Sequence, residues 1–539
     1  NCHLFVSWMV TLEKLVEEMD PKVVSTNFRL WLTSYPSPAF PVLILQNGVK
    51  MTNEPPKGLR ANMLGSYLSD PISDPEFYAK CEKQDSWRKM LFGLCFLHAW
   101  LQERRKYGPL GWNIPYEFNE SDLRICVRQL QMFLDLYDEV PFAALNYLTA
   151  ECNYGGRVTD DKDRRTMNTA VANIYNEGII ADGFKLTESG KYTVPVEALD
   201  SVEATMDYVR QWPLVPQPEV FGLNENADIT KDLKEVAQTL TTVLITQSAS
   251  GGGGGGKSAD EQLLDMAKDI ANKLPANFDI ELAQKRYPVM YDECKNTVVC
   301  QELQRFNKLL SKVRGSLQDL QKALKGLVVM NADLEGLSKA MMNNQLPDLW
   351  AKVSYPSLKP LSSYIAELLE RLSFFQSWVD DGPPVIFQMP HFFFVQAFMT
   401  GVLQNYARKY TIPIDTVDFD FEYFKNIPGV APDDGAYTHG LFLEGARMSD
   451  ETGELKLMES QPKVLFAPMV CVLLKPCPAD QLMVFQHYEC PCYRTTARRG
   501  VLATTGHSSN FVMFLRVPTT ETKAHWITRG CALVNSLPD

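Results

Sequence analysis

The stretch from residue 28 to residue 63 constrains the fold more than any other, because strand-like patterning gives way to helical patterning within it. Two short apolar runs, at 30–32 and 42–45, are each bounded by turn residues. Runs of this length between turns predict buried strands of a layered α/β sheet. After Pro55-Pro56 the apolar residues recur with the helical period. We therefore expect the chain to begin in the last part of a parallel sheet and to continue into a helical domain.

Composition narrows the class of protein. The 539 residues suggest about three or four domains, and contents of 45% hydrophobic and 22% charged residues are those of a globular protein. The net charge of −12 argues against a nucleic-acid or anionic-membrane surface, because both attract basic faces. The longest apolar run, at 90–101, is shorter than the roughly 20 residues that span a bilayer, so it is predicted to be a buried helix.

The first residues, Asn1-Cys2-His3, resemble the interior of a fold and no signal-like segment precedes them, so the sequence is interpreted as part of a longer protein. Twelve scattered cysteines fit free thiols in a reducing compartment. A cluster of possible zinc ligands comprises Cys471, Cys477, His487, Cys490 and Cys492. Their spacing lacks the paired cysteines of structural zinc sites, so no metal site is predicted.

Long and irregular motifs point to a family. They lie at 28–36, 49–63, 111–118, 152–161, 355–361, 401–415 and 504–508. In residues and order these motifs closely resemble the end of the sixth AAA+ module and the C-terminal region of dynein heavy chains. Within that family, the segments 355–361 and 407–415 are more similar to axonemal (ciliary) heavy chains than to cytoplasmic ones.

The resemblance implies a multidomain α/β plus α+β fold in four parts. Residues 1–56 would be the truncated end of the sixth AAA+ large subdomain, an α/β layer, and residues 57–225 the helical AAA+ lid with its extension. Residues 226–385, with a Gly-rich linker at 248–258, would form the helical bundle of the C-terminal domain. Residues 386–539 would add a helix and a small antiparallel β-barrel.

The nucleotide site of the sixth module is expected to be inactive. By the resemblance, Asn1-Cys2-His3 stands where AAA+ modules carry the carboxylates that hold Mg²⁺, and neither Asn nor Cys replaces a carboxylate on a hard cation. Thr33-Ser34 stand where such modules carry a polar phosphate sensor, although ending a strand is the favoured role. Arg157 is predicted to form a structural ion pair with a neighbouring helix rather than to sense nucleotide. Asp160-Asp161 is placed to cap the following helix.

A Gly-rich segment matches the P-loop pattern G-x-x-x-x-G-K-[ST]. Its defining positions are Gly251, Gly256, Lys257 and Ser258. Residues 241–245 before it could form a strand, and a helix is predicted at 259–273. Six consecutive glycines satisfy any glycine pattern, however, and no carboxylate-ending strand follows. Such composition is typical of a flexible linker, and a P-loop NTPase is kept as the alternative.

Residues 259–410 are predicted to be mainly helical. Apolar residues three and four apart form one seam, made of Leu303, Phe306, Leu310, Val313, Leu317, Leu320 and Leu324. We expect the seam to pack inside a helical bundle, because it is short and Gly315 weakens it. An adaptor that binds a helical partner through this seam is the alternative. Phe392-Phe393-Phe394 is predicted to belong to the core.

From residue 412 the apolar period changes to two. Strands are predicted at 417–421, 437–443, 463–466, 470–474, 487–493 and 511–517. Short strands at this spacing fit a small β-barrel or sandwich.

The resemblance implies a mechanical role. Dynein heavy chains are minus-end-directed microtubule motors that drive ciliary and flagellar beating, and they use ATP and Mg²⁺ in modules upstream of this region. On this basis the chain would close the motor's ring and regulate it, with no catalytic residue and no cofactor of its own. Its expected partners are the other AAA+ modules of the same heavy chain, while the parent binds microtubules and intermediate and light chains. Neither nucleic acid nor a membrane is expected, and the expected location is the axoneme, within the cytoskeleton.

Overall fold

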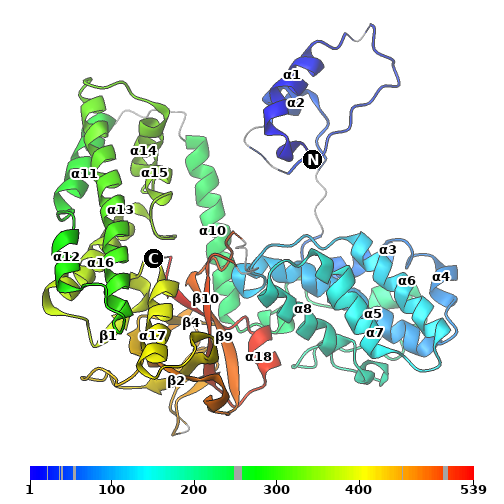
Figure 1. The fold of residues 1–539 in the computed structure, drawn as a ribbon. Helices are drawn as coiled ribbons and strands as arrows, with labels where there is room; N and C mark the ends of the chain where they lie inside the picture. The colour runs from blue at the N-terminus through cyan, green and yellow to red at the C-terminus, as the bar shows by residue number, and fades with distance from the viewer. Residues whose placement is uncertain are drawn as a thin grey trace. The chain divides into compact units, whose positions relative to one another are not determined.

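Figure 1 shows the fold in the computed structural model, which describes residues 1–20, 22–35, 37, 40–51, 56–247, 258–451, 453–501 and 508–538. For residues 241–247 it describes the backbone alone. The chain divides into two compact units, Asn1–Pro56 and Lys57–Asp539.

The first unit contains helices where strands are predicted. The 3-10 turns η1 (Cys2–Leu4) and η2 (Val6–Trp8) lead into α1 (Met9–Glu17). The predicted strand at 42–45 is wrong, because these residues lie in α2 (Val42–Asn47). Residues 30–32 have no regular structure, so the expected α/β layer is not observed in the described part of this unit. A strand needs a partner strand for its backbone groups, whereas a helix satisfies them locally.

The second unit begins with helices packed around α5. They are α3 (Leu59–Leu68), α4 (Pro75–Ala79), α5 (Gln84–Arg104), α6 (Glu120–Leu136), α7 (Phe142–Tyr147), α8 (Asp161–Ile174) and α9 (Val202–Arg210). The side chains of α5 from Met90 to Leu101 are all buried, as in a helix that is apolar on every face. The prediction of a buried helix at 90–101 is therefore confirmed. These helices share a hydrophobic core that runs from Leu59 to Ala227, here called the helical core.

Two local predictions in this region are confirmed. Asp160 caps α8, because its side chain accepts hydrogen bonds from the N–H groups of Lys162 at 2.9 Å and Asp163 at 3.2 Å. Arg157 pairs with Asp122 of α6, with 2.9 Å between Nε and Oδ2.

A long helix, α10 (Asn226–Gln247), follows the helical core. The strand considered at 241–245 is wrong, since these residues continue this helix. A bundle of helices comes next, formed by α11 (Ala259–Lys273), α12 (Ile280–Arg286), α13 (Cys294–Leu324), α14 (Ala332–Met342), α15 (Asp348–Ala351) and α16 (Leu361–Asp381).

The apolar seam of α13 lies inside this bundle. Its residues from Leu303 to Leu320 are fully covered, and Leu324 is partly buried against them. They face α11, α14, α16 and α17 (Val395–Lys409). A side chain at Gly315 would meet open space, so this glycine lies outside the packed face. The prediction that the seam packs within a bundle is confirmed.

The strands form two main sheets beside α17. The four-stranded sheet has the order β1 (Ile386–Gln388), β3 (Ala436–His439), β8 (Cys471–Pro478) and β2 (Val417–Phe424). The five-stranded sheet has the order β10 (Phe511–Pro518), β9 (His487–Thr495), β11 (Ala532–Ser536), β4 (Phe442–Glu444) and β7 (Phe466–Pro468). A small pair, β5 (Arg447–Ser449) and β6 (Lys456–Met458), completes the described strands.

The predicted antiparallel β-barrel is wrong. Two of the pairings, β1 with β3 and β9 with β11, are parallel, and the described strands form open sheets with free edges. The cause is the path of the last strand, since β11 follows α18 (Lys523–Thr528) and enters between β9 and β4. A period-two pattern identifies strands but does not contain their order.

The sheets and the bundle share one hydrophobic core from Leu263 to Leu533, here called the C-terminal core. Phe392 is buried in it and Phe393 packs against it, whereas Phe394 is 40% exposed. The core prediction thus holds for the first two of these three residues. The described helices include none whose length and hydropathy together would carry it through a bilayer.

Candidate functional site

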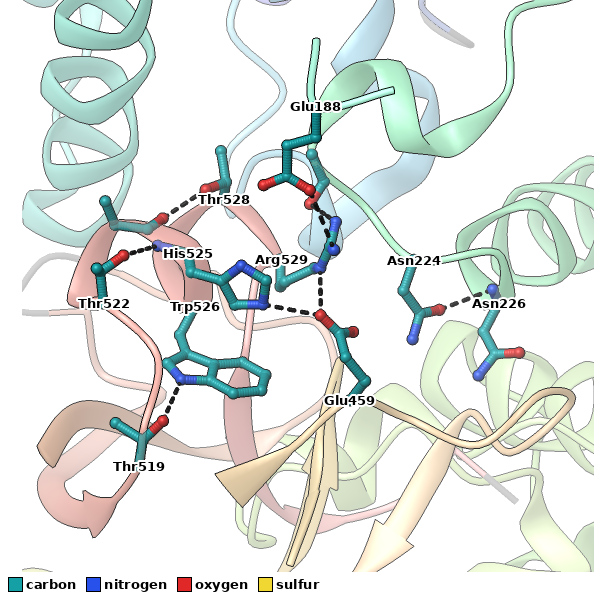
Figure 2. A network of polar contacts seen from close by, with 12 residues as sticks. Glu188, Asn224, Asn226, Glu459, Thr519, Thr522, His525, Trp526, Thr528 and Arg529 are labelled. Carbon is teal, nitrogen blue, oxygen red and sulfur yellow. Dashed lines mark hydrogen bonds and ion pairs between the residues drawn. The ribbon is translucent and has the colours of Figure 1, made fainter. Parts of the chain in front are cut away.

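The helical core and the C-terminal core meet along a polar boundary, here called the junction. The helical core contributes the end of α5, residues 108–114, α8 and residues 221–226. The C-terminal core contributes β9, residues 459–464, residues 497–500 and α18. Figure 2 shows the contacts around α18.

Arg104, the last residue of α5, is fully buried at the junction. Its guanidinium donates to the carbonyl oxygens of Gly111 at 2.9 Å, Leu110 at 3.3 Å and Phe221. A further bond, of 2.7 Å, reaches the carbonyl oxygen of Thr528 at the end of α18. Burial lowers the pKa of Arg104 to about 9, so the group remains charged at neutral pH. Main-chain carbonyls therefore hold a buried cation where the two cores meet.

Asn226, the first residue of α10, fastens the helix to a loop of the C-terminal core. Its Nδ2 donates to the carbonyl oxygens of Gln461 at 2.8 Å and Val464 at 2.9 Å. Its Oδ1 accepts from the N–H of Lys463 at 2.7 Å. Asn226 is buried, and an amide that uses both its donors and its acceptor fixes the position of the loop.

Arg529 and His525 meet at Glu459 (Figure 2). The Nε of Arg529 donates to Oε1 of Glu459 at 2.9 Å, and Nε2 of His525 lies 2.8 Å from the same oxygen. Arg529 also donates to the carbonyl of Gly222 at 3.0 Å and lies 3.7 Å from Glu188. Burial raises the pKa of Glu459, but the hydrogen bonds from His525 and Arg529 outweigh it and hold the pKa below its ordinary value. Glu459 is therefore a charged anchor that holds the side chains of both Arg529 and His525.

The orientation of α18 is fixed by its own capping and packing. Thr522 accepts from the N–H of His525 at 3.3 Å and so caps the helix. Trp526 is fully buried and donates its Nε1 to Oγ1 of Thr519 at 2.7 Å. These contacts direct the last carbonyl groups of α18 towards Arg104.

Two glycines bring the backbones of the two cores together. Gly222 has φ of +69°, and a Cβ at this position would lie 2.8 Å from Cγ2 of Thr528. Gly530 has φ of +67°, and its Cβ would lie 2.5 Å from the carbonyl oxygen of Leu110. Only glycine adopts this conformation readily and leaves the space free.

Helix α8 presents two cations to the five-stranded sheet. Arg165 donates to Oη of Tyr488 at 2.9 Å and to the carbonyl of Glu489 at 3.0 Å. The Nζ of Lys162 lies 3.8 Å from the centre of the Phe511 ring, and burial lowers the pKa of this lysine. Cations over desolvated rings contribute about 1–2 kcal/mol each, so this contact also holds the cores together.

A buried carboxyl group, Asp163, lies beside these cations. Its oxygens accept from the N–H groups of Asn113 at 2.9 Å and Ile114 at 3.1 Å. Asn113 in turn donates its side-chain amide to Oη of Tyr493 on β9 at 3.0 Å. Burial, reinforced by Asp160, raises the pKa of Asp163 to about 7. The charge of this group therefore changes near neutral pH.

Arg498 forms a buried ion pair with Glu444, with 2.5 Å between the guanidinium nitrogen and Oε2. It also donates to the carbonyl oxygen of Pro109 at 3.4 Å. Its φ of +56° is uncommon for a residue with a side chain, and the ion pair holds it there.

The junction encloses little empty space. A cavity of ≈ 10 Å³ lies beside Asn226 and Arg529, and a second of ≈ 20 Å³ lies between α8, β9 and Arg498. One water needs about 10–15 Å³ of such space, so neither cavity has room for a nucleotide.

Of the residues that define the P-loop pattern, the structure describes Ser258. Gly251, Gly256 and Lys257 fall outside the described residues. Ser258 begins α11, where its Oγ accepts from the N–H of Glu261 at 3.2 Å and its own N–H donates to Oε2 of Glu261 at 3.0 Å. This is a capping box, and it occupies the serine hydroxyl in helix capping.

The residues at the expected sixth-module site contact one another within the first unit. The carbonyl of Thr33 accepts from the N–H of Cys2 at 2.8 Å, and Nδ1 of His3 accepts from the N–H of Tyr35 at 3.1 Å. The hydroxyl of Ser34 donates to the carbonyl of Tyr35 at 2.8 Å. Arg157 lies in the second unit, paired with Asp122.

The cysteines near the C-terminus are packed in the sheet. Sγ of Cys490 lies 4.0 Å from Sγ of Cys531, and Cys492 donates to Oδ1 of Asn535 at 3.2 Å. Burial raises the pKa of Cys492 and of Cys531, which favours neutral thiols over the thiolates that bind metals. Within the residues described, no group of three or more His, Cys, Asp or Glu side chains is placed to hold a metal ion.

Sequence patterns did not single out the arginines of the junction, Arg104, Arg165, Arg498 and Arg529. Their acceptors are mainly carbonyl groups supplied by distant parts of the protein, which leave no trace in local patterns. The only sequence signal was indirect, since the motifs at 111–118 and 152–161 contain Asn113 and Asp160.

Three family models match successive parts of the sequence, and two of them meet near the start of α10. The family model for the AAA lid domain of the dynein heavy chain matches residues 87–227, and the model for the C-terminal domain of the dynein heavy chain matches residues 233–535. The model for the D6 P-loop domain region of the dynein heavy chain matches residues 1–52. The change from lid to C-terminal domain thus falls within the first turns of α10.

Individual relatives match along the whole sequence. Human dynein axonemal heavy chain 12 is 52% identical over 100% of this chain and 17% of its own length. Human dynein axonemal heavy chain 3 is 55% identical over 99% of this chain and 13% of its own length, and human dynein axonemal heavy chain 1 is 46% identical over 100% and 12%. The chain therefore spans less than a fifth of these relatives. Since the C-terminal domain alone accounts for more than half of its residues, the chain belongs to the dynein heavy chain family, with axonemal heavy chains as its relatives.

Proposed function

We propose that this chain is the non-catalytic, ring-closing and regulatory part of an axonemal dynein heavy chain, a minus-end-directed microtubule motor that drives ciliary and flagellar beating. The observation that carries the proposal is the bond from the fully buried Arg104, at the end of a lid helix, to the carbonyl oxygen of Thr528 in the C-terminal domain. A lid attached in this way turns only together with the C-terminal domain. The two therefore act as one lever.

The lid and the C-terminal domain move together because opening the junction would cost free energy. Separation of the cores would leave the guanidinium of Arg104 and the amide of Asn226 without their acceptors across the junction. Each hydrogen bond exchanged for bonds to water costs about 0.5–1.5 kcal/mol, and bonds to a charged group cost about 1.5–3 kcal/mol. Forces on the lid are thus passed to the C-terminal domain, because the junction resists opening.

The outer face of α10 supports contact with the other AAA+ modules of the same heavy chain. Ile229, Leu233, Val236 and Leu240 recur four, three and four residues apart and are 36%, 55%, 55% and 58% exposed. A row of exposed apolar side chains on one helix face is typical of an interaction surface. The present sequence spans 12–17% of the length of its relatives, so the occupant we propose is the remainder of the heavy chain.

On this proposal the upstream modules bind ATP and Mg²⁺, and this chain has neither a cofactor nor a catalytic residue of its own. Its four parts are 1–56, the end of the sixth AAA+ large subdomain; 57–225, the lid; 226–385, the helical C-terminal part with the linker 248–258; and 386–539, the part with the sheets. Microtubules and intermediate and light chains are partners of the parent, which acts in the axoneme.

The test compares two variants of a heavy chain that contains this region. Asn226→Ala removes the side-chain bonds to 461–464 across the junction. Asn168→Ala removes a bond of 2.7 Å to Glu151 within the helical core and is the matched control. We expect Asn226→Ala to change microtubule gliding velocity while basal ATPase stays near the wild-type value, and Asn168→Ala to change neither. Wild-type gliding by Asn226→Ala would show that the junction does not transmit movement.

The second candidate function is a P-loop NTPase that uses residues 251–258. One observation favours it, namely that the pattern is followed at once by a helix, α11. Nucleotide binding separates the two candidates.

A further inference from the structure

The ≈ 20 Å³ cavity of the junction is lined by cationic side chains. Lys162 and Arg165 reach it from α8, and Arg498 reaches it from the turn at 497–500. Asp163 is the carboxyl group in the lining. Arg498 is neutralised by Glu444 behind it, whereas Lys162 and Arg165 contact aromatic rings.

Two of these cationic side chains each have an N–H donor without a hydrogen-bond partner. The Nε atoms of Arg165 and Arg498 are buried and have no hydrogen-bond partner among the described residues. The other nitrogens of Arg165 already donate to Tyr488 and Glu489. Among the side chains of the described residues that line the cavity, these two donors are the buried atoms without a partner, and no buried acceptor lacks one. The cavity therefore suits a guest that accepts hydrogen bonds.

Asp163 does not cancel the positive charge of this lining. Its oxygens already accept from the N–H groups of Asn113 and Ile114. Burial raises its pKa to about 7, so the group is only partly charged at neutral pH. Asp160, the N-cap residue of α8, is engaged in capping the helix. The lining is therefore positive on balance.

We propose that this cavity binds a single chloride-sized anion that bridges the helical core and the C-terminal core. A space of ≈ 20 Å³ admits one small sphere, given that a water needs about 10–15 Å³. A water must also donate two hydrogen bonds, whereas a halide only accepts, and the unpaired side-chain atoms of the lining are donors. Because Arg165 belongs to the helical core and Arg498 to the C-terminal part, an anion held by both stabilises the closed junction.

Thermal unfolding of the whole protein tests the site. The unfolding temperature is measured in sodium chloride, sodium bromide and sodium gluconate at equal ionic strength. We expect a rise with chloride or bromide concentration that exceeds the rise in gluconate, as binding to the folded state requires. Arg165→Gln should abolish the halide-specific rise. Arg164→Gln should keep it, because Arg164 pairs with Glu151 at 2.6 Å and does not line the cavity.

The halide-dependent difference is the quantity compared, since Arg165→Gln also loses its bonds to Tyr488 and Glu489. A crystal soaked in bromide supplies the direct readout. An anomalous peak between Arg165 and Arg498 supports the site, and the absence of a peak there overturns it. A halide-specific rise that survives Arg165→Gln, or equal stabilisation by chloride and gluconate, also overturns it.

Discussion

Arg104 and Thr528 are 424 residues apart in the sequence, yet the guanidinium of one donates to the main-chain carbonyl of the other at 2.7 Å. The bond joins the end of α5 to the end of α18. Since the acceptors that hold Arg104 are all carbonyl oxygens, the position needs a planar donor and not only a positive charge.

Replacement of Arg104 by methionine should lower the free energy of unfolding by about 2–4 kcal/mol, because buried carbonyl groups lose their donor while the apolar volume is kept. Urea unfolding of the whole protein measures this. Arg105→Met is the control, since Arg105 is only half-buried. It should change stability by less than about 0.5 kcal/mol. Equal losses in the two variants would contradict the role given to Arg104.

Gly222→Ala should destabilise the protein more than Gly183→Ala does. Both glycines have positive φ, +69° and +70°, so both changes carry a backbone penalty of about 1–2 kcal/mol. Only at Gly222 does the added Cβ meet another atom, Cγ2 of Thr528 at 2.8 Å. The difference between the two melting temperatures isolates the close approach of the cores. An equal loss of stability in both variants would show that the junction accommodates the added methyl group without a loss of free energy.

The raised pKa of Asp163 predicts that stability falls as pH rises from about 4 to about 7. In this window the unfolded carboxyl group, with an ordinary pKa of about 3.9, has released its proton while the folded one still holds it. The folded state therefore loses relative stability as pH rises, by a few kcal/mol at about 1.4 kcal/mol per pKa unit.

Asp163→Asn should flatten this part of the pH profile of urea unfolding, because the amide does not titrate. Asp161→Asn, at an exposed position in the first turn of α8, is the control and should leave the slope unchanged. A slope that persists in Asp163→Asn would assign the pH dependence to another group.

Ser258→Asp should keep the stability of α11, because aspartate also caps helices, whereas Ser258→Ala should cost about 1 kcal/mol.

A fluorescent ATP analogue with Mg²⁺ should bind neither to the wild-type protein nor to Lys257→Ala. Binding that Lys257→Ala abolishes would make residues 251–258 a phosphate site. Binding that survives the substitution would place the nucleotide site outside residues 251–258.

Leu310→Ala should lower the free energy of unfolding by about 2–5 kcal/mol, because the side chain is fully buried in the seam of α13. Leu327→Ala, at a position that is 73% exposed, should be nearly neutral. Limited proteolysis provides a second readout, since a packed seam resists cleavage. Rapid cleavage within α13 in the wild-type protein would instead favour the adaptor that binds a helical partner.

Features with a local cause could be predicted from the sequence. The seam of α13, the buried helix at 90–101 and the cap by Asp160 follow from spacing and residue type within one element. The pair between Arg157 and Asp122 was expected in kind, although its partner was not named.

Features that depend on distant residues could not be predicted. The segment 42–45 is apolar enough for a strand, but a strand needs a partner strand for its backbone groups. The segment forms a helix instead, which satisfies those groups within itself. The position of β11 between β9 and β4 depends on the path through α18, so open sheets form in place of a barrel. Likewise the roles of Arg104 and Arg165 depend on carbonyl groups hundreds of residues away.

The separation of Arg104 and Thr528 along the sequence also determines how much later Thr528 is synthesised. At about 5–20 residues per second, the ribosome needs roughly 20–85 s to pass from one to the other. During that interval α5 has emerged, and Gly111 and Phe221 become available to Arg104 before Thr528 does. The nascent polypeptide thus passes through a stage in which the helical core has been synthesised but Thr528, the acceptor on α18, has not. A ribosome that stops before residue 528 therefore releases a protein in which Arg104 lacks its bond to α18, so residues made late decide how firmly a helix made much earlier is held.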